Sequence, residues 1–338
     1  LFYVITPYQD LHHFTGAASS LKNQTYGNWR WVIACTQMEK DKLIERLHGY
    51  LSFKRIVFLQ VDAQASEQQK IARAGDWTAQ LGQKNTWEAI LGASDTLEPD
   101  ALYSCMRLFE QDPDMDLCYT DEDRLSEDGK LYTDPVFKSD FNIDMLRAMN
   151  YFGHMVLIRT DLMKKVGAWS PSFGTNASYD YNLRAAEAAA SIGHLPRVVY
   201  HSRELGKQVH QPCENILNAH YKRQGIPAEA SSSQVPGIYH TTYQLEETPL
   251  VSINIPNKDH MDDLDTCVQS VLKMCTYPNY EIVIIENNST EDSTFAYYKK
   301  LQEQDQRVRV VYWKEEFNYA KIANFGAAQS KGSYLLLL

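Results

Sequence analysis

Short apolar runs alternate with helical segments along most of the chain. Residues 1–5, 31–34, 282–285 and 334–338 are apolar runs of strand length. Continuous runs of this kind are typical of strands buried on both faces of a sheet, and the helical segments between them are typical of crossover connections. The pattern predicts an α/β protein with a mostly parallel sheet flanked by helices.

The same pattern occurs twice. Three sequence blocks recur in the same order about 250 residues further along the chain. Residues 5–10, 21–29 and 87–91 correspond to residues 254–259, 272–280 and 334–338. Each copy reads as strand, proline-containing turn, helix, strand, helix, strand, helix, strand. The repeat predicts two copies of one α/β unit in tandem.

Composition shifts suggest where the copies end. Residues 226–248 are rich in Ser, Pro and Gly, as linkers often are. We therefore expect a first domain at residues 1–225, a linker at 226–248 and the N-terminal half of a second domain at 249–338. Both chain ends lie in apolar runs, which favours a piece of a longer protein. A truncated sheet would expose an edge near residues 335–338, a predicted site of self-association.

Charge and cysteine usage narrow the class of protein. The net charge of -10 argues against a nucleic-acid partner bound through phosphate contacts. Six scattered cysteines without a Cys-x-x-Cys pair are typical of reduced thiols in the cytosol. The sequence predicts a cytoplasmic protein, with peripheral attachment to the inner face of the membrane left open.

Several polar blocks follow the predicted strands. In the second copy they are residues 251–259, 286–290 and 317–326, and in the first copy residues 119–123 and 196–201. These blocks resemble glycosyltransferase family 2, with its GT-A fold, and above all the tandem rhamnosyltransferase-like enzymes of bacterial polysaccharide and O-antigen synthesis. The resemblance covers nearly the whole chain. It implies an enzyme that moves a sugar from a nucleotide-diphosphate donor to a growing cell-surface polysaccharide.

The resemblance also implies a cofactor and an acceptor. The leaving group carries two phosphates, and in this fold Mn²⁺ or Mg²⁺ held by an Asp-x-Asp motif neutralises it, often with a later His as a further ligand. A carboxylate base deprotonates a hydroxyl of the acceptor. The acceptor would be a glycan or a lipid-linked glycan.

The second copy matches the family's nucleotide-binding pattern better than the first. By resemblance, the nucleotide-binding candidates of the two copies are Pro256, Asn257, Asp259, Glu286, Asn318, Asn324, Pro7 and Tyr8. The uracil and ribose would sit at the carboxyl ends of the first strands. The alternative for Asp259 and Glu286 is that they are solvated loop acids.

The first copy departs from the family pattern. After its fourth strand, Gly92 and Ser94 replace both expected metal carboxylates, and only Asp95 remains. Neutral side chains cannot hold a hard cation with comparable strength. His201 matches the later histidine, so the candidate metal ligands are Asp95 and His201. The alternative for His201 is a packed or surface histidine.

The catalytic half of the first copy is also altered. Ser178 stands where the family has its base, although it is equally a plausible helix N-cap. Asp180 survives and is the catalytic candidate. Asp121, Asp123 and His154 are candidates for the acceptor side, with turn or packing roles as the alternative.

Two functions therefore remain open. In the first, the second copy is the competent site of a glycosyltransferase, completed by chain beyond Leu338. In the second, the first copy is a non-catalytic pseudo-glycosyltransferase domain that binds the acceptor glycan or scaffolds a partner. The sequence contains no Gly-x-Gly-x-x-Gly after a strand, so a dinucleotide oxidoreductase has little support.

Overall fold

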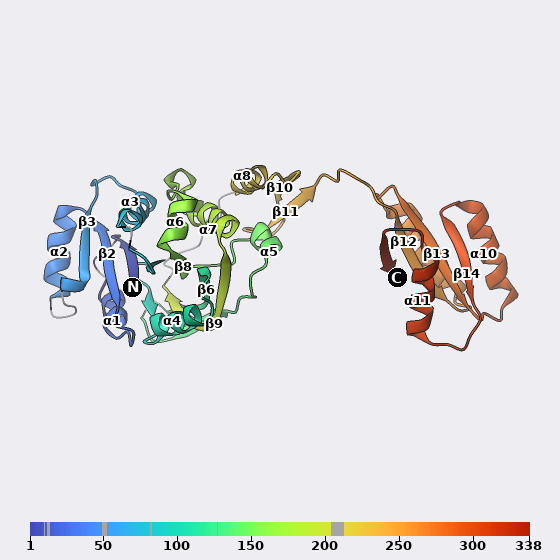
Figure 1. Ribbon diagram of the computed structural model, residues 1–338, viewed down its shortest axis with the longest axis horizontal. Helices are drawn as coiled ribbons and strands as arrows, with labels where there is room; N and C mark the ends of the chain where they lie inside the picture. The colour runs from blue at the N-terminus through green and yellow to red at the C-terminus, as the bar shows by residue number, and fades with distance from the viewer. Residues whose placement is uncertain (10, 12–13, 49–52, 82, 127, 204–212) are drawn as a thin grey trace. The chain divides into compact units, whose positions relative to one another are not determined.

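The chain folds into two compact units, Leu1–Tyr243 and Gln244–Leu338 (Figure 1). The computed structural model describes residues 1–9, 11, 14–48, 53–81, 83–126, 128–203 and 213–338. Asp10, the last residue of the first repeat block, lies outside the described residues. The predicted α/β class is confirmed. None of the described helices combines the length and the apolar character that a membrane crossing requires.

The first unit begins with four parallel strands in the order β3-β2-β1-β4. They are β1 (Phe2–Pro7), β2 (Trp29–Cys35), β3 (Ile56–Gln60) and β4 (Trp87–Ile90). The connections carry α1 (Phe14–Lys22), α2 (Gln37–Leu47), the short 3-10 helix η1 (Phe53–Arg55) and α3 (Glu67–Gln80). Every residue of β1 is buried, as expected for a strand covered on both faces.

The sheet then continues with antiparallel additions. β8 (Val156–Arg159) pairs antiparallel with both β4 and β6 (Met115–Leu125), and β9 (Ser191–Ser202) lies parallel to β6. Two further strands, β5 (Thr96–Leu97) and β7 (Tyr132–Val136), pair with β9 and β6. The helical elements of this half are α4 (Ala101–Gln111), α5 (Ile143–Ala148), α6 (Thr160–Val166), η2 (Pro171–Asn176) and α7 (Ala177–Ala188).

The stretch predicted as a linker contains regular structure instead. Helix α8 (Glu214–Gln224) ends at Gly225 in the left-handed conformation, and β10 (Ala228–Ser232) and β11 (Tyr239–Tyr243) then form an antiparallel hairpin. Ala230 and Tyr239 are buried in one of the apolar cores of the first unit. The Ser, Pro and Gly content reflects the hairpin turn, where Gly237 has φ 80°.

The second unit is a four-stranded parallel sheet in the order β14-β13-β12-β15. Its elements are β12 (Val251–Asn257), α9 (Met261–Met274), β13 (Tyr280–Asn287), α10 (Asp292–Gln304), β14 (Val308–Trp313), α11 (Tyr319–Gln329) and β15 (Tyr334–Leu337). Pro7 is opposite Ala34 in the first unit, and Pro256 is opposite Ile285 in the second. The two prolines therefore lie at the ends, or one residue before the ends, of strands that pair in parallel with the next strand of their unit.

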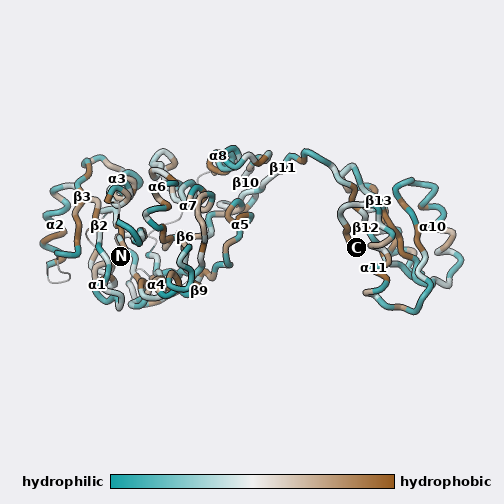
Figure 2. Tube along the Cα trace, in the orientation of Figure 1, coloured by the Kyte–Doolittle hydropathy of each residue, from teal (hydrophilic) through white to brown (hydrophobic). Residues whose placement is uncertain are grey.

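Each unit has its own apolar core. Strand β13 is buried along its whole length, and Tyr298 and Leu301 of α10 pack against its unit's core. In the first unit Trp87 stacks on Phe109, with ring centroids 3.6 Å apart. Figure 2 shows hydrophobic residues along the inner strands and a largely hydrophilic α10. These cores fix the strand ends at which the candidate site residues lie.

Candidate functional site

Glu286 and Asn257 meet at the carboxyl ends of β13 and β12, where they are opposite one another in the sheet. The Glu286 side chain is buried, with 3% of the residue exposed. Its Oε2 accepts hydrogen bonds from the hydroxyls of Tyr298 and Ser289, each at 2.6 Å, and its Oε1 accepts from the Ser289 amide. The Asn257 amide donates to the Tyr298 hydroxyl at 2.8 Å. The structure thus brings two predicted pocket residues into one network.

Asp259 shapes the loop beside this network. It has φ 63°, and its carboxylate accepts from the backbone amides of Thr290 and Glu291 at 2.8 and 3.0 Å. The hydrogen bond from the Glu291 amide is the main cause that holds the pKa of Asp259 below its ordinary value. The Asp259 amide in turn donates to the Ser289 hydroxyl at 2.9 Å. Ser289, which the sequence pattern did not single out, therefore connects both acids.

The other candidates of the second unit lie on or beside α11 and β12. Asn318 caps α11 by accepting from the Lys321 amide at 3.0 Å, and Asn324 is exposed on the same helix. Pro256 is half-buried at the end of β12. A Cβ on Gly326 would overlap Cδ1 of Ile285, so the missing side chain lets α11 pack closely on β13.

At the equivalent edge of the first unit, internal contacts engage the candidate residues. Pro7 is buried, and the half-buried ring of Tyr8 stacks on Phe14 with centroids 5.5 Å apart. Lys70 donates to the Tyr8 carbonyl at 2.6 Å. Thr36 follows Cys35, the residue at the place in β2 that Glu286 has in β13, and it forms a capping box with Glu39 at the start of α2.

At the position where the resemblance implies an Asp-x-Asp metal motif, Asp95 is hydrogen-bonded to other groups of the protein. Asp95 is buried, and its Oδ2 accepts from the Tyr200 hydroxyl at 2.5 Å while its Oδ1 accepts from the Arg203 amide at 2.7 Å. A Cβ on Gly92 would overlap Asp95 Oδ2. Burial and the neighbouring Asp95 charge raise the pKa of Tyr200 well above its ordinary value, so its hydroxyl stays a donor. Asp95 here acts as a hydrogen-bond acceptor for β9.

His201 is held between two carboxylates. Its Nδ1 lies 2.6 Å from Asp123 Oδ1, and its Nε2 lies 3.0 Å from Glu98 Oε1. The ring is 4.4 Å from that of Tyr132, and 3% of the residue is exposed. Both ring nitrogens are therefore used, and the packed alternative describes this histidine.

The metal site expected at Asp95 and His201 stays a prediction, and these contacts show how the two side chains are held in the structure. Among the residues that the structure describes, no three His, Cys, Asp or Glu side chains form a group that could hold a metal ion. The donor atoms of both predicted ligands are occupied by protein partners instead. With these partners in place, the described residues around Asp95 and His201 do not fit Mn²⁺ or Mg²⁺.

The acceptor-side candidates Asp121 and His154 contact polar side chains of the first unit. Asp121 Oδ1 lies 2.9 Å from His194 Nε2, and His154 Nδ1 lies 3.1 Å from Glu122 Oε1. Lys138 Nζ pairs with Glu122 at 3.0 Å. Burial alone would raise the pKa of Glu122, but the His154 hydrogen bonds and the Lys138 charge lower it to about 2. Glu122 lies in the block of residues 119–123 that carried the resemblance, but the sequence pattern assigned no role to it, to Lys138 or to His194.

Asp180, the catalytic candidate, is also hydrogen-bonded to another side chain. Asp180 is buried and accepts from Arg184 Nε at 2.9 Å, one helical turn further along α7. Arg184 also donates to the carbonyls of Val166 and Ala168. Asp180 thus positions the arginine that fixes the end of α6. Ser178 is not the N-cap that was suggested, because α7 begins at Ala177 with Asn176 as its N-cap.

Comparisons with known proteins agree with the resemblance. Residues 252–338 match the glycosyl transferase family 2 model. The chain is 32% identical over 100% of its length to the O-antigen biosynthesis protein RfbC of Myxococcus xanthus, of which it covers 27%. It is 29% identical over 94% of its length to uncharacterized protein y4gI of Sinorhizobium fredii, of which it covers 36%. The chain therefore spans only about a third or less of these relatives.

Similar solved structures include S. aureus TarS 1–349 in complex with UDP. The TM-score is 0.49 with 13% sequence identity, over 65% of this chain and 64% of that chain. A TM-score at this level carries no conclusion about ligands of the present chain.

Proposed function

We propose that this chain is part of an enzyme that transfers a sugar from a nucleotide-diphosphate donor to a growing cell-surface polysaccharide, because residues 252–338 match the glycosyl transferase family 2 model. The observation that carries the proposal is the Glu286 carboxylate, fixed by Ser289 and Tyr298 at the end of β13. Ligands of open α/β sheets bind at the carboxyl ends of the strands. The name of the O-antigen biosynthesis relative supports the polysaccharide product.

Glu286 would bind the nucleoside part of the donor. Ribose hydroxyls and base N–H groups are donors, and a carboxylate offers acceptor positions for them. Because three protein groups already orient Glu286, little side-chain freedom would be lost on binding. Asp259 would act indirectly, by holding the loop that carries Ser289.

The second unit would bind the nucleotide. The metal ion and the acceptor are proposed for the whole protein and not for this chain alone. When bound, Mn²⁺ or Mg²⁺ would neutralise the diphosphate leaving group. The acceptor would be a glycan or a lipid-linked glycan at the inner face of the membrane. The exposed leucines of β15 support pairing of that edge with another strand.

A non-catalytic role for the first unit is favoured by a separate observation. Its candidate catalytic and metal residues Asp180, Asp95 and His201 all have internal partners. We propose that this unit is a pseudo-glycosyltransferase domain that holds acceptor glycan or a partner. The two roles are compatible, one for each unit.

Sugar transfer by the full-length protein tests the proposal. Glu286→Ala should lower kcat/KM for the nucleotide sugar at least tenfold, because the nucleoside loses its acceptor. Asp95→Asn in the first unit is the matched control and should leave the rate within about twofold. Full activity of Glu286→Ala, or loss of activity only in Asp95→Asn, would refute the assignment.

A further inference from the structure

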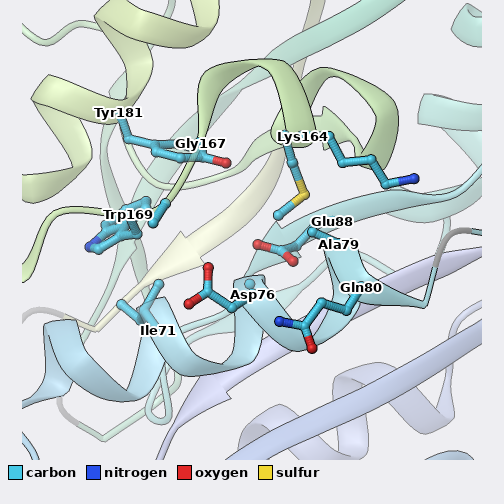
Figure 3. A pocket seen from close by; sticks show the side chains of 12 residues that line it. Ile71, Asp76, Ala79, Gln80, Glu88, Lys164, Gly167, Trp169 and Tyr181 are labelled. Carbon is cyan, nitrogen blue, oxygen red and sulfur yellow. The ribbon is translucent and has the colours of Figure 1, made fainter.

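A cavity of about 240 Å³ opens in the first unit between α3, β4, α6 and α7 (Figure 3). Its lining includes Gly75, Asp76, Glu88, Met163, Trp169 and Tyr181. Glu88 is the second residue of β4, so the cavity lies beside the strand and not at its carboxyl end. Neither the nucleotide site nor the metal position described above uses this cavity.

Glu88 provides a buried polar group on the cavity floor. Glu88 is 8% exposed, and the Thr78 hydroxyl lies within hydrogen-bond distance of the Glu88 Oε2 atom. The same hydroxyl lies 2.9 Å from the Gly75 carbonyl, so Thr78 ties Glu88 to the backbone of α3. Burial, opposed in part by Thr78, raises the pKa of Glu88 to about 8, with the Asp76 charge adding to the rise.

Gly75 keeps this carboxyl accessible from the cavity. It lies inside α3, where glycine costs about 1 kcal/mol relative to alanine. A Cβ at this position would lie 3.4 Å from Glu88 Oε1 and 3.6 Å from Met163 Cε. A methyl group therefore just fits, and any larger side chain would project into the cavity beside Glu88.

Aromatic side chains form the opposite wall. The rings of Trp169 and Tyr181 are 5.0 Å apart, and Trp169 Nε1 donates to Gln68 at 3.0 Å. Arg184 lies 5.1 Å from the Tyr181 ring and holds the loop before Trp169 through the Ala168 carbonyl. In Figure 3 the Asp76 carboxylate extends from α3 into the space between Ile71, Trp169 and Glu88. The aromatic wall is thus held in place by Gln68 and Arg184, and the carboxylate oxygens of Asp76 face it.

A second, smaller cavity of about 40 Å³ adjoins the first. The two share Glu88, Trp169 and Tyr181, and the smaller one is also lined by His154 and Ser178. Those last residues mark the acceptor and base positions of the family pattern. The larger cavity therefore continues from the side of the first unit where an acceptor would approach.

We propose that this cavity binds one sugar ring of the glycan that the enzyme extends, an inference that rests on the proposed function and names the ligand site of the first unit. Ligand pockets combine apolar and aromatic walls with a few placed polar groups, as here. Sugar hydroxyls would donate to Asp76 and Glu88, and the apolar ring face would lie on the aromatic wall. The volume is below the roughly 300–1,000 Å³ of drug-sized sites, which suits a single ring.

Saturation-transfer NMR on the 338-residue chain tests this, with the methyl glycosides of glucose, galactose, mannose and rhamnose as probes. We expect at least one glycoside to bind. Gly75→Leu should weaken that binding at least tenfold by filling the cavity, whereas Gly75→Ala should change it by no more than about threefold. Absence of binding by all four glycosides, or binding that Gly75→Leu leaves unchanged, would overturn the proposal.

Two controls distinguish a filled sugar site from a disturbed helix and from a cation site. Arg73→Leu places a leucine on an exposed position of the same helix and should leave glycoside binding unchanged; a loss there equal to that of Gly75→Leu would overturn the proposal. If tetramethylammonium binds and none of the glycosides does, the cavity is a cation site and the proposal is overturned. UDP titration of Gly75→Leu reports on the second unit, so failure of sugar binding can be told from failure of the proposed nucleotide site.

Discussion

The Tyr200 hydroxyl donates to the Asp95 carboxylate at 2.5 Å, and that carboxylate occupies the space that a side chain on Gly92 would need. A side chain at position 92 and the inward position of Asp95 therefore exclude one another. A reversion at position 92 alone would meet a protein group already in place. Both oxygens of Asp95 have protein partners, the Tyr200 hydroxyl and the Arg203 amide.

The overlap predicts the effect of adding a methyl group. Gly92→Ala should lower the free energy of unfolding by about 1–3 kcal/mol, because overpacking a filled site forces neighbours to move. Removing the obstructing carboxylate in Gly92→Ala/Asp95→Ala should make the combined loss smaller than the sum of the single losses. Urea unfolding followed by tryptophan fluorescence measures this. Gly27→Ala is the control, because a Cβ there meets nothing closer than 3.8 Å; additive losses would contradict the account.

The first unit should not bind manganese tightly. Both nitrogens of His201 and both oxygens of Asp95 have protein partners, so a cation would have to displace them. Electron paramagnetic resonance of added Mn²⁺ should show no more bound metal in the unmodified chain than in His201→Ala. Tight binding that His201→Ala removes would restore the predicted metal site.

Stability of the first unit should fall as pH rises, because of Glu88. Its pKa is raised in the folded state to about 8 from an ordinary value of 4.5. The folded state therefore holds a proton that the unfolded state releases, and this stabilisation is complete below about pH 4.5 and lost between there and pH 8. The slope is at most about 1.4 kcal/mol per pH unit. Glu88→Gln should unfold with a shallower pH dependence in this window; an unchanged dependence would show that Glu88 ionises normally.

Tyr298 is predicted to support Glu286. In Tyr298→Phe the carboxylate loses one donor and the buried Asn257 amide loses its acceptor, which costs about 1–3 kcal/mol. Hydrogen exchange of the β12 and β13 amides should become correspondingly faster. Tyr297→Phe removes a surface hydrogen bond to Asp265 and is the matched control, with little expected change. Equal effects of the two variants would mean that the Glu286 network is not stabilising.

Much of the architecture followed from the sequence, because strand burial and turn chemistry are local signals. The apolar runs predicted the strands, and the proline-ended blocks predicted the strand ends where Glu286 and Asn257 meet. The hairpin at Ala230 and Tyr239 was missed, because a polar, Pro-Gly-rich stretch resembles a linker until its few apolar residues find a core. The sequence could not show which acids face a ligand.

Partners distant in the sequence decided that question. His201 depends on Glu98 and Asp123, and only the fold shows that these groups are close enough to pair. The buried Glu88 was missed for the same reason. A single acid in a strand gives no sign of the cavity that α3 and α7 build above it.

The most direct test of the central claim is calorimetric titration of the chain with UDP, with and without Mn²⁺. The account predicts binding that does not require the metal, that Glu286→Ala abolishes and that Thr36→Ala in the first unit leaves unchanged. Binding that depends on Mn²⁺, or that survives Glu286→Ala and is lost in Thr36→Ala, would place the nucleotide site in the first unit and contradict the account.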